Sequence, residues 1–405
     1  MHRAHSIRYL LLSTTFALGA TLSEHSHAAN ANFQNFLFAA CANASGDLAV
    51  RCSESNGGDV SGDSESSLNP SQTLVQNTNA LQEAVAAVRA LRDGDDTTTI
   101  EQASFGRWSV VISGDQSRLI RDPGGDNSRG YTLEMDALRL ALDYRYSDRL
   151  VAGALLIDGR SESRLTPYIP SGQFPAYNPD RSGASKSTST SLGAYSHLFL
   201  SPHWSLDGLL LYTLSDYDIF RDAVFQVSAR NNDSPVSTRA STEGRQLALG
   251  GGLHYDNHHG SLNYGGFVRA DYQDSTIDSY RERGGNGLAL HVSDADADQW
   301  LVSGGISAAY TILTDVAVIQ PHAFIEHQRK TGASPASRVV RLLEDSGDNT
   351  LTLTGSKEDS TLNRVGAGIG MVWPNGVNGF ATFSRDYSSK GVYRTQFTAG
   401  LRIEF

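Results

Sequence analysis

The sequence predicts an all-β protein, a twelve-stranded antiparallel transmembrane β-barrel, and three observations lead to this prediction. From Phe105 onward, about twelve segments alternate apolar and polar residues with period two. Each segment is close to the length that crosses a bilayer as a tilted strand. The connections between segments alternate between tight turns and long polar loops, and aromatic residues lie near the segment ends. All three features are typical of outer-membrane barrels.

The alternation is clear in many of the segments. In residues 138–146, for example, leucines and tyrosines alternate with Arg139, Ala141, Asp143 and Arg145. The same period is found in 105–113, 246–255, 263–273, 300–312, 364–373 and 393–405. The aromatic residues near segment ends are Trp108, Tyr144, Trp204, Tyr255, Trp300 and Trp373. We expect one face of each strand to contact lipid and the other to line a polar lumen, with the aromatic residues at the membrane surfaces.

The connections are sorted by length. The short ones lie at 147–148, 201–202, 256–260, 313–314 and 374–378, and the long ones at 114–130, 159–186, 215–243, 273–297 and 328–360. One connection that should be long, at residues 386–391, is shorter than the other connections on the same end of the barrel. A soluble β-sandwich has no physical reason to sort its loops, whereas outer-membrane barrels have short periplasmic turns and long external loops. We therefore expect both ends of the barrel domain, residues 105–405, to lie in the periplasm.

Composition excludes several classes of protein. The chain carries 33 Lys and Arg against 44 Asp and Glu, a net charge of −11, which argues against a nucleic-acid surface. The mean hydropathy is −0.31 and no apolar run of membrane-helix length follows the first residues, which excludes a helical membrane protein. Residues 1–28 have the pattern of a signal peptide, because Arg3 and Arg8 precede an apolar stretch and small residues precede a cleavage point after Ala28.

The exported segment that follows, residues 29–68, is rich in Ser, Asn, Gly and Asp, and outside 33–40 it has little apolar surface to bury. It contains the two cysteines of the chain, Cys41 and Cys52. Two cysteines this close together in an exported chain predict one disulfide. A loop of that size stabilises the folded state by about 2–3 kcal/mol in the chain-entropy model.

Residues 69–94 predict a single helix. Asn69 can cap it, Pro70 suits its first turn and Gly94 ends the pattern. Its apolar residues recur at helical spacing, and those expected to face the pore wall are Leu74, Leu81, Val85 and Val88. At 1.5 Å per residue the helix would be roughly 35 Å long, which matches the thickness of a membrane. An amphipathic helix in the periplasm or on the membrane surface is the alternative.

The last eight residues look like the signal that the barrel-assembly machinery reads. That pattern has a polar residue, a glycine two positions later and a terminal aromatic, and Thr398, Gly400, Ile403 and Phe405 occupy its places. A strand with one apolar face and a free end can pair with another sheet. The order of parts narrows the resemblance: signal, exported segment, one helix of membrane length and about twelve strands. This layout resembles the translocator domain of autotransporters, the type V secretion family.

The resemblance implies that the helix of residues 69–94 lies inside the pore and links an external passenger to the first strand. Its apolar residues would face the smooth wall formed by Gly366, Gly368 and Gly370. Its polar residues would meet lumen groups, for which the candidates are Arg269, Asp271, Glu326, Arg364 and Arg402. The resemblance also implies a Gram-negative outer membrane, with lipid, the barrel-assembly machinery and periplasmic chaperones as partners, and we expect a monomer. The passenger is far shorter than is usual in the family.

A search for chemistry finds no catalytic, cofactor or metal site, and we expect no enzyme and no cofactor. Residues 62–65 resemble an esterase motif only superficially, because forty polar residues cannot hold a catalytic serine in place. His258 and His259, with His254 nearby, are interpreted as solvated residues of a turn. Asn77 and Asn79 are not adjacent, unlike the cleavage point of self-cutting autotransporters, so the passenger is expected to stay attached.

The sequence therefore predicts an autotransporter translocator that displays its short N-terminal segment at the cell surface. One alternative is a porin-like channel or an adhesin that binds through its loops, in which the helix does not occupy the lumen. A second alternative is an outer-membrane hydrolase.

Overall fold

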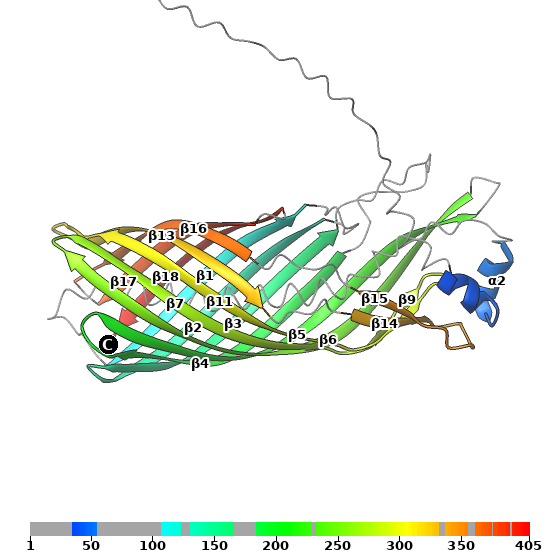
Figure 1. The fold of residues 1–405 in the computed structure, drawn as a ribbon, viewed down its shortest axis with the longest axis horizontal. Helices are drawn as coiled ribbons and strands as arrows, with labels where there is room; N and C mark the ends of the chain where they lie inside the picture. Colours follow the sequence, from blue (N-terminus) through cyan, green and yellow to red (C-terminus); the bar gives the residue numbers. More distant parts are fainter. Residues whose placement is uncertain are drawn as a thin grey trace, which may run out of the picture.

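The computed structural model describes residues 35–54, 107–122, 130–165, 184–227, 232–331, 337–354, 361–374, 376–388 and 391–405. In this part of the chain twelve antiparallel strands form a closed barrel, as the sequence predicts (Figure 1). They are β1 (Trp108–Arg121), β2 (Tyr131–Ser147), β3 (Leu150–Leu165), β4 (Ala184–Phe199), β5 (Trp204–Val227), β6 (Asn232–His259), β7 (Leu262–Ile277), β11 (Ala295–Tyr310), β13 (Val318–Thr331), β16 (Thr361–Val372), β17 (Val377–Tyr387) and β18 (Val392–Glu404). Each strand pairs with the next in this order, and β1 pairs with β18 to close the sheet.

The two faces of the sheet differ as the period-two pattern predicts. On β6, Leu247 and Leu249 are exposed on the outer face, whereas Gln246 and Ala248 are buried on the inner face. Aromatic rings pair across strands on the outer face, with Trp108 on Tyr144, Trp204 on Tyr255 and Tyr272 on Trp300 at centroid distances of 4.7, 5.1 and 5.2 Å. An outer face of leucines and tyrosines and an inner face of polar groups are what a lipid-embedded barrel requires.

The two ends of the barrel differ, and we call them the turn end and the loop end. The turn end carries the short connections, the start of β1 and the end of β18. The loop end carries the longer connections, including those between β7 and β11 and between β13 and β16.

The strands extend into several of the predicted loops, and most of all into 215–243. Residues 215–243 are mostly strand, because β5 and β6 stay paired from Trp204–Tyr255 out to Val227–Asn232. The lipid-facing alternation stops at the membrane surface, but hydrogen bonding between the two strands does not, so the apolar pattern underestimates their length.

A small second sheet lies at the loop end. It is built from the connections of the barrel, in the order β15 (Leu351–Thr354), β14 (Ser337–Leu342), β10 (Leu290–Val292) and β8 (Tyr280–Arg281). We call it the loop sheet. Two shorter strands extend the barrel sheet itself, β9 (Arg283–Gly284) beside β6 and β12 (Ile312–Leu313) beside β13.

The N-terminal segment lies beside the loop sheet. It consists of a short helix at residues 35–41 and α2 (Gly46–Glu54), and Figure 1 places α2 next to β9, β14 and β15, at the loop end. The predicted disulfide between Cys41 and Cys52 is present and joins the two helices. Within the described residues, no helix is long and apolar enough to cross a membrane.

The largest apolar core of the described chain is at the loop end. Its buried residues come from the N-terminal segment (Phe36, Leu37, Ala40 and Leu48), from the loop sheet and its connections (Tyr280, Leu288, Leu290, Val292, Val340, Leu342 and Leu353) and from the barrel strands (Tyr217, Ile219, Ala240, Ile277 and Ala295). A smaller cluster inside the barrel includes Val111, Leu155 and Leu211. Three parts of the chain that are far apart in sequence thus share one core.

The lipid-facing assignment can be tested at Leu249. This residue pairs with Leu210 midway along the apolar belt of β5, and both side chains are exposed. We expect Leu249→Arg to lower the free energy of unfolding by about 2–4 kcal/mol, because a cation near the bilayer midplane is poorly solvated. Unfolding in lipid vesicles by denaturant measures this change. Ser241→Arg is the matched control, because it is on the same strand and face but beyond the belt. Equal tolerance of the two variants would contradict the assignment.

Candidate functional site: the barrel lumen and the loop end

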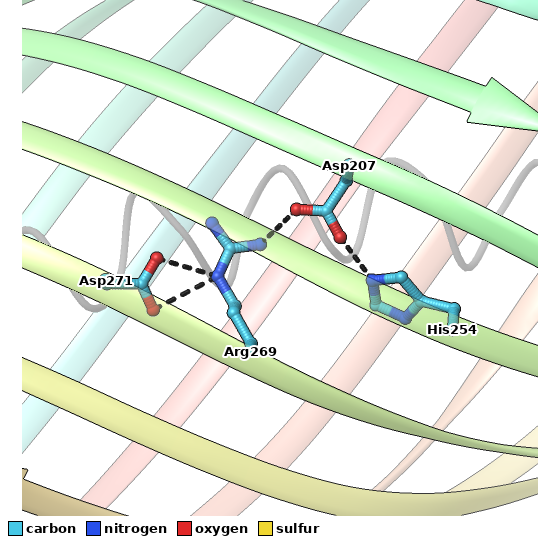
Figure 2. A network of polar contacts seen from close by, with 4 residues as sticks. All are labelled: Asp207, His254, Arg269 and Asp271. Atoms are coloured by element: carbon cyan, nitrogen blue, oxygen red, sulfur yellow. Dashed lines mark hydrogen bonds and ion pairs between the residues drawn. The ribbon is translucent and has the colours of Figure 1, made fainter.

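A network of four buried polar residues lines the lumen near the turn end (Figure 2). Arg269 on β7 donates from Nη1 to Asp207 Oδ2 on β5 at 2.6 Å, and from Nε to the two carboxylate oxygens of Asp271 at 2.8 and 3.1 Å. His254 on β6 contacts the other carboxylate oxygen of Asp207 through Nε2. All four side chains lie together on the lumen face of β5, β6 and β7 (Figure 2). The guanidinium of Arg269 is shared by the carboxylates of Asp207 and Asp271.

Two glycines of β6 make this network possible. Gly252 lies in register between Asp207 and Arg269, and Gly250 pairs with Asp271. A Cβ atom on Gly252 would be 2.6 Å from Asp207 Oδ1, and one on Gly250 would be 2.0 Å from Asp271 Oδ1. Both distances are shorter than van der Waals contact. Arg269 can therefore reach across β6 only because β6 has no side chains at these two positions.

A second network crosses four adjacent strands nearer the loop end. Glu326, Arg364, Asp386 and Arg394 are direct register neighbours on β13, β16, β17 and β18, with alternating charge. Asp386 accepts hydrogen bonds from Arg364 Nε at 2.7 Å and from Arg394 Nε at 2.8 Å. Arg364 Nη1 is 3.7 Å from Glu326 Oε2. Because the side chains are almost fully buried, each charge depends on its strand neighbours for stabilisation.

A third network lies at the turn end beside the closing strands. Asp143 on β2 accepts hydrogen bonds from Ser109 Oγ and from Tyr195 Oη, the latter at 2.9 Å. Arg402 on β18 is 3.5 Å from the same carboxylate. This network therefore links β1, β2, β4 and β18, the strands on both sides of the point where the barrel closes.

The five predicted lumen residues are all buried on the inner face. The structure brings Arg269 together with Asp271, and Glu326 together with Arg364, whereas Arg402 is near Asp143 instead. Their predicted partner is the helix of residues 69–94, with Leu74, Leu81, Val85 and Val88, which lies outside the described residues. Contact between that helix and the lumen residues therefore stays a prediction.

Sequence reasoning missed Asp207, Asp386 and Arg394, and it misplaced His254. His258 and His259 are exposed near a turn, as predicted, but β6 continues to His259, which puts His254 inside the lumen against Asp207. Inner-face parity could have identified each residue as lumen-facing. Their partners could not be identified, because an ion pair across two strands depends on the register between them.

The charged side chains of the lumen networks are held in fixed ion pairs. Asp207, Asp271 and Asp386 are each bound by an arginine, so their carboxylates act as counterions for guanidinium groups. Within the described residues, no group of three His, Cys, Asp or Glu side chains could hold a metal ion.

At the loop end, the N-terminal segment is docked onto the loop connections by specific contacts. Glu344, which follows β14, accepts a hydrogen bond from the backbone N–H of Leu48 at 2.8 Å. Its carbonyl oxygen accepts hydrogen bonds from Ser45 N and Ser45 Oγ, both at 2.9 Å. Leu48 is at the start of α2, where backbone N–H groups lack helical partners. A carboxylate from the loop therefore caps this helix.

Two further contacts fix the position of the segment. Ser346 donates from its N–H and its hydroxyl to Asn43 O, at 3.1 and 2.8 Å. Gly287 has a φ of +90° and lies so close to α2 that a Cβ there would be 2.4 Å from Leu48 N. Any larger residue at position 287 would push the helix away from the loop sheet.

The comparisons with known proteins agree with this architecture. The family model described as the autotransporter beta-domain matches residues 110–384, more than half of the chain. The chain belongs to the autotransporter family. No curated protein matches it in sequence.

Two solved autotransporter structures are similar in fold. The translocator domain of autotransporter NalP from Neisseria meningitidis has 16% identity and a TM-score of 0.57, over 83% of this chain and 99% of that one. The beta domain of the Bordetella autotransporter BrkA has 17% identity and a TM-score of 0.48, over 74% of this chain and 100% of that one. The protein is thus an outer-membrane autotransporter translocator of a Gram-negative bacterium.

The C-terminal residues predicted to form the barrel-assembly signal are part of the closed sheet in this autotransporter. Thr398 and Gly400 lie on the inner face of β18, and Ile403 and Phe405 are exposed on the outer face. The backbone of Phe405 exchanges hydrogen bonds with that of Trp108, at 2.9 and 3.1 Å. Both edges of β18 are paired, one with β1 and one with β17.

The role of Arg269 can be tested by removing its charge. Arg269→Met leaves Asp207 and Asp271 buried without their shared cation, which we expect to cost about 3–5 kcal/mol of stability. Thermal unfolding in detergent, followed by the heat-dependent shift of barrels on gels, measures the loss. The triple variant Arg269→Met, Asp207→Asn, Asp271→Asn removes the uncompensated charges and should recover most of it. A triple variant as unstable as the single one would show that packing, not charge pairing, is the contribution of Arg269.

Proposed function

We propose that this translocator carries the predicted exported segment, residues 29–68, to the cell surface and keeps it bound there. The N-terminal segment described above is part of it. The observation that supports this proposal is the position of residues 35–54, which are docked at the loop end. In outer-membrane barrels the short turns face the periplasm and the long loops face the outside. The docked segment is then outside the cell, at the opposite end of the barrel from the start of β1.

The route of the connecting chain supports the same proposal. Residue 54 is at the loop end and residue 107 is at the turn end, so the covalent chain of residues 55–106 joins opposite ends of the barrel. A path through lipid would leave unpaired backbone groups in a medium without water, which is very costly. We therefore infer a path through the lumen. A helix over 69–94 would be long enough, at roughly 1.5 Å per residue.

The closing strand supports a role for the barrel-assembly machinery. A free strand edge can pair with another sheet, but both edges of β18 are occupied in the closed barrel. The pattern of Thr398, Gly400, Ile403 and Phe405 would therefore be read before β18 pairs with β1. Periplasmic chaperones would protect the apolar outer face until that point. We propose no catalytic role, because the carboxylates of the described lumen networks are bound by arginines or by hydrogen-bond donors.

Surface display can be tested by a cleavage site for a specific protease, inserted after Asp59. Protease added to intact cells should cut this site, because residues 29–68 are proposed to be outside. The matched control carries the same site between Gly260 and Ser261, in the turn between β6 and β7, and should be cut only after the outer membrane is permeabilised. Immunoblotting of both variants measures the result. Protection of the Asp59 site in intact cells would sink the proposal of surface display.

Docking can be tested on the same cleaved protein. After the cut at Asp59, the N-terminal fragment should stay with the barrel during size-exclusion chromatography under non-denaturing conditions. Leu48→Asp should release it, because Leu48 is fully buried and an unpaired carboxylate there is costly, weakening the contact by roughly a hundredfold or more. Val50→Asp is the control on the same helix, since Val50 is 54% exposed. Release of the wild-type fragment would show that display does not include docking.

A further inference from the structure

A row of basic side chains runs from the outer face of the loop sheet onto the adjoining strands β9 and β6. Arg281 on β8 pairs in register with His291 on β10, and His291 pairs with Arg341 on β14. Arg283 follows two residues after Arg281 and pairs with Arg239 on β6. We call these five residues the basic row. Tyr280 and Glu282 alternate with the arginines and are buried, so Arg281 and Arg283 both point outward.

The basic row is electrostatically unfavourable as it stands. Like charges directly opposite each other in a sheet destabilise it, and here Arg283 faces Arg239, while Arg281 and Arg341 lie on the two sides of His291. Arg239 stacks on the ring of Phe220, with its Cζ 5.5 Å from the centroid, and Arg341 is 3.0 Å from the exposed Asp348. Among the residues that the structure describes, no carboxylate lies within ion-pair distance of Arg239, Arg281 or Arg283.

The environment of His291 gives a second indication of positive potential. Burial, and then the guanidinium groups of Arg341 and Arg281 on the two flanking strands, lower the pKa of His291 below its ordinary value. The whole chain has a net charge of −11, so this concentration of cations is opposite in sign to the rest of the molecule. A cluster that the fold holds together against repulsion is suited to an anionic ligand.

The dimensions of the row indicate the shape of that ligand. Three strand spacings of about 4.8 Å separate Arg341 from Arg239, and one two-residue step of about 3.3 Å per residue runs at right angles to them, so the row is roughly 16 Å from end to end. Arg239 is eight residues beyond Leu247, the outermost leucine of the apolar belt on β6, which is roughly 26 Å of strand. Because the strands of such barrels tilt by roughly 35–45°, Arg239 lies roughly 20 Å above the belt, outside a headgroup layer that is roughly 5–8 Å thick. Arginine also binds sulfate and carboxylate groups through two parallel hydrogen bonds.

We propose that the basic row binds a linear polyanionic glycan outside the cell, with sulfate or carboxylate groups contacting Arg239, Arg281, Arg283 and Arg341. This inference rests on the proposed function, because the loop sheet shares its core with the docked residues 35–54. The two fail in different ways: release of the cleaved N-terminal fragment contradicts docking, whereas loss of glycan binding with the fragment still docked contradicts only this inference.

The test uses the full-length protein in detergent and a heparin-derived dodecasaccharide, with binding measured by calorimetry. We expect binding that weakens as salt is added, because exposed ion contacts are screened. The variant Arg281→Gln, Arg283→Gln, Arg341→Gln should raise the Kd by about tenfold or more. The control variant Arg107→Gln, Arg145→Gln, Arg149→Gln removes the same charge at the turn end and should leave the Kd unchanged. Equal losses in the two variants would overturn the proposal.

Two further arms separate charge from folding. Replacing the same three arginines of the basic row by lysine keeps the charge and should retain most of the binding. The desulfated oligosaccharide keeps its carboxylates but loses most of its charge, and should bind the wild-type protein about tenfold more weakly or worse, whatever the stability of the variants. Absence of heparin binding at physiological salt would overturn the proposal. Binding that appears only when Asp59, Asp63 and Glu65 are changed to Asn or Gln would also overturn it, since the row would then be occupied by the chain's own acidic segment.

Discussion

The structure depends on the pairing between its first and last strands. β1 and β18 are joined in continuous register from Ser109–Glu404 to Arg121–Val392. Without that pairing, two strand edges would present unpaired N–H and C=O groups to a medium that cannot hydrogen-bond them. Closure converts the sheet into a cylinder with one face toward lipid and one face enclosed. The alternation of apolar and polar residues follows from this geometry, because successive side chains on each strand point to opposite faces.

Closure also determines what the inner face must contain. Charged groups enclosed in the barrel lose much of their hydration, and each is stabilised only by partners on neighbouring strands. The second lumen network meets this requirement in one register only, in which Glu326, Arg364, Asp386 and Arg394 are direct neighbours. A two-residue slip of β17 would move Asp386 away from both arginines and place Ser384 or Ser388 opposite Arg364. Buried ion pairs add little net stability on average. We therefore interpret the lumen networks chiefly as determinants of strand register.

The sequence was sufficient to predict the barrel but not the assembly at its loop end. Twelve strands with period two give a repeated signal, and a disulfide between Cys41 and Cys52 follows from there being only two cysteines, close together in an exported segment. The loop sheet gives no such signal, because its strands have two to six residues. Its contact with the N-terminal segment joins Leu48 to Glu344, which are 296 positions apart. No local pattern encodes a contact of that range. The partners of Asp207 were hidden for a related reason, since three strands must be in register before Arg269 can reach it.

The N-terminal segment and the loop sheet each lack the means to fold alone. Two short helices joined by one disulfide have too little apolar surface for an independent core, and so has a sheet of four short strands. Together with Tyr217 and Ile219 on the extended β5, they bury one common core. Glu344 completes the first turn of α2, and Gly287 leaves room for its backbone. If residues 29–68 are displayed as proposed, this mutual dependence explains how they can hold their position outside the cell. The segment needs no fold of its own, because the loops of the barrel supply the other half of its core.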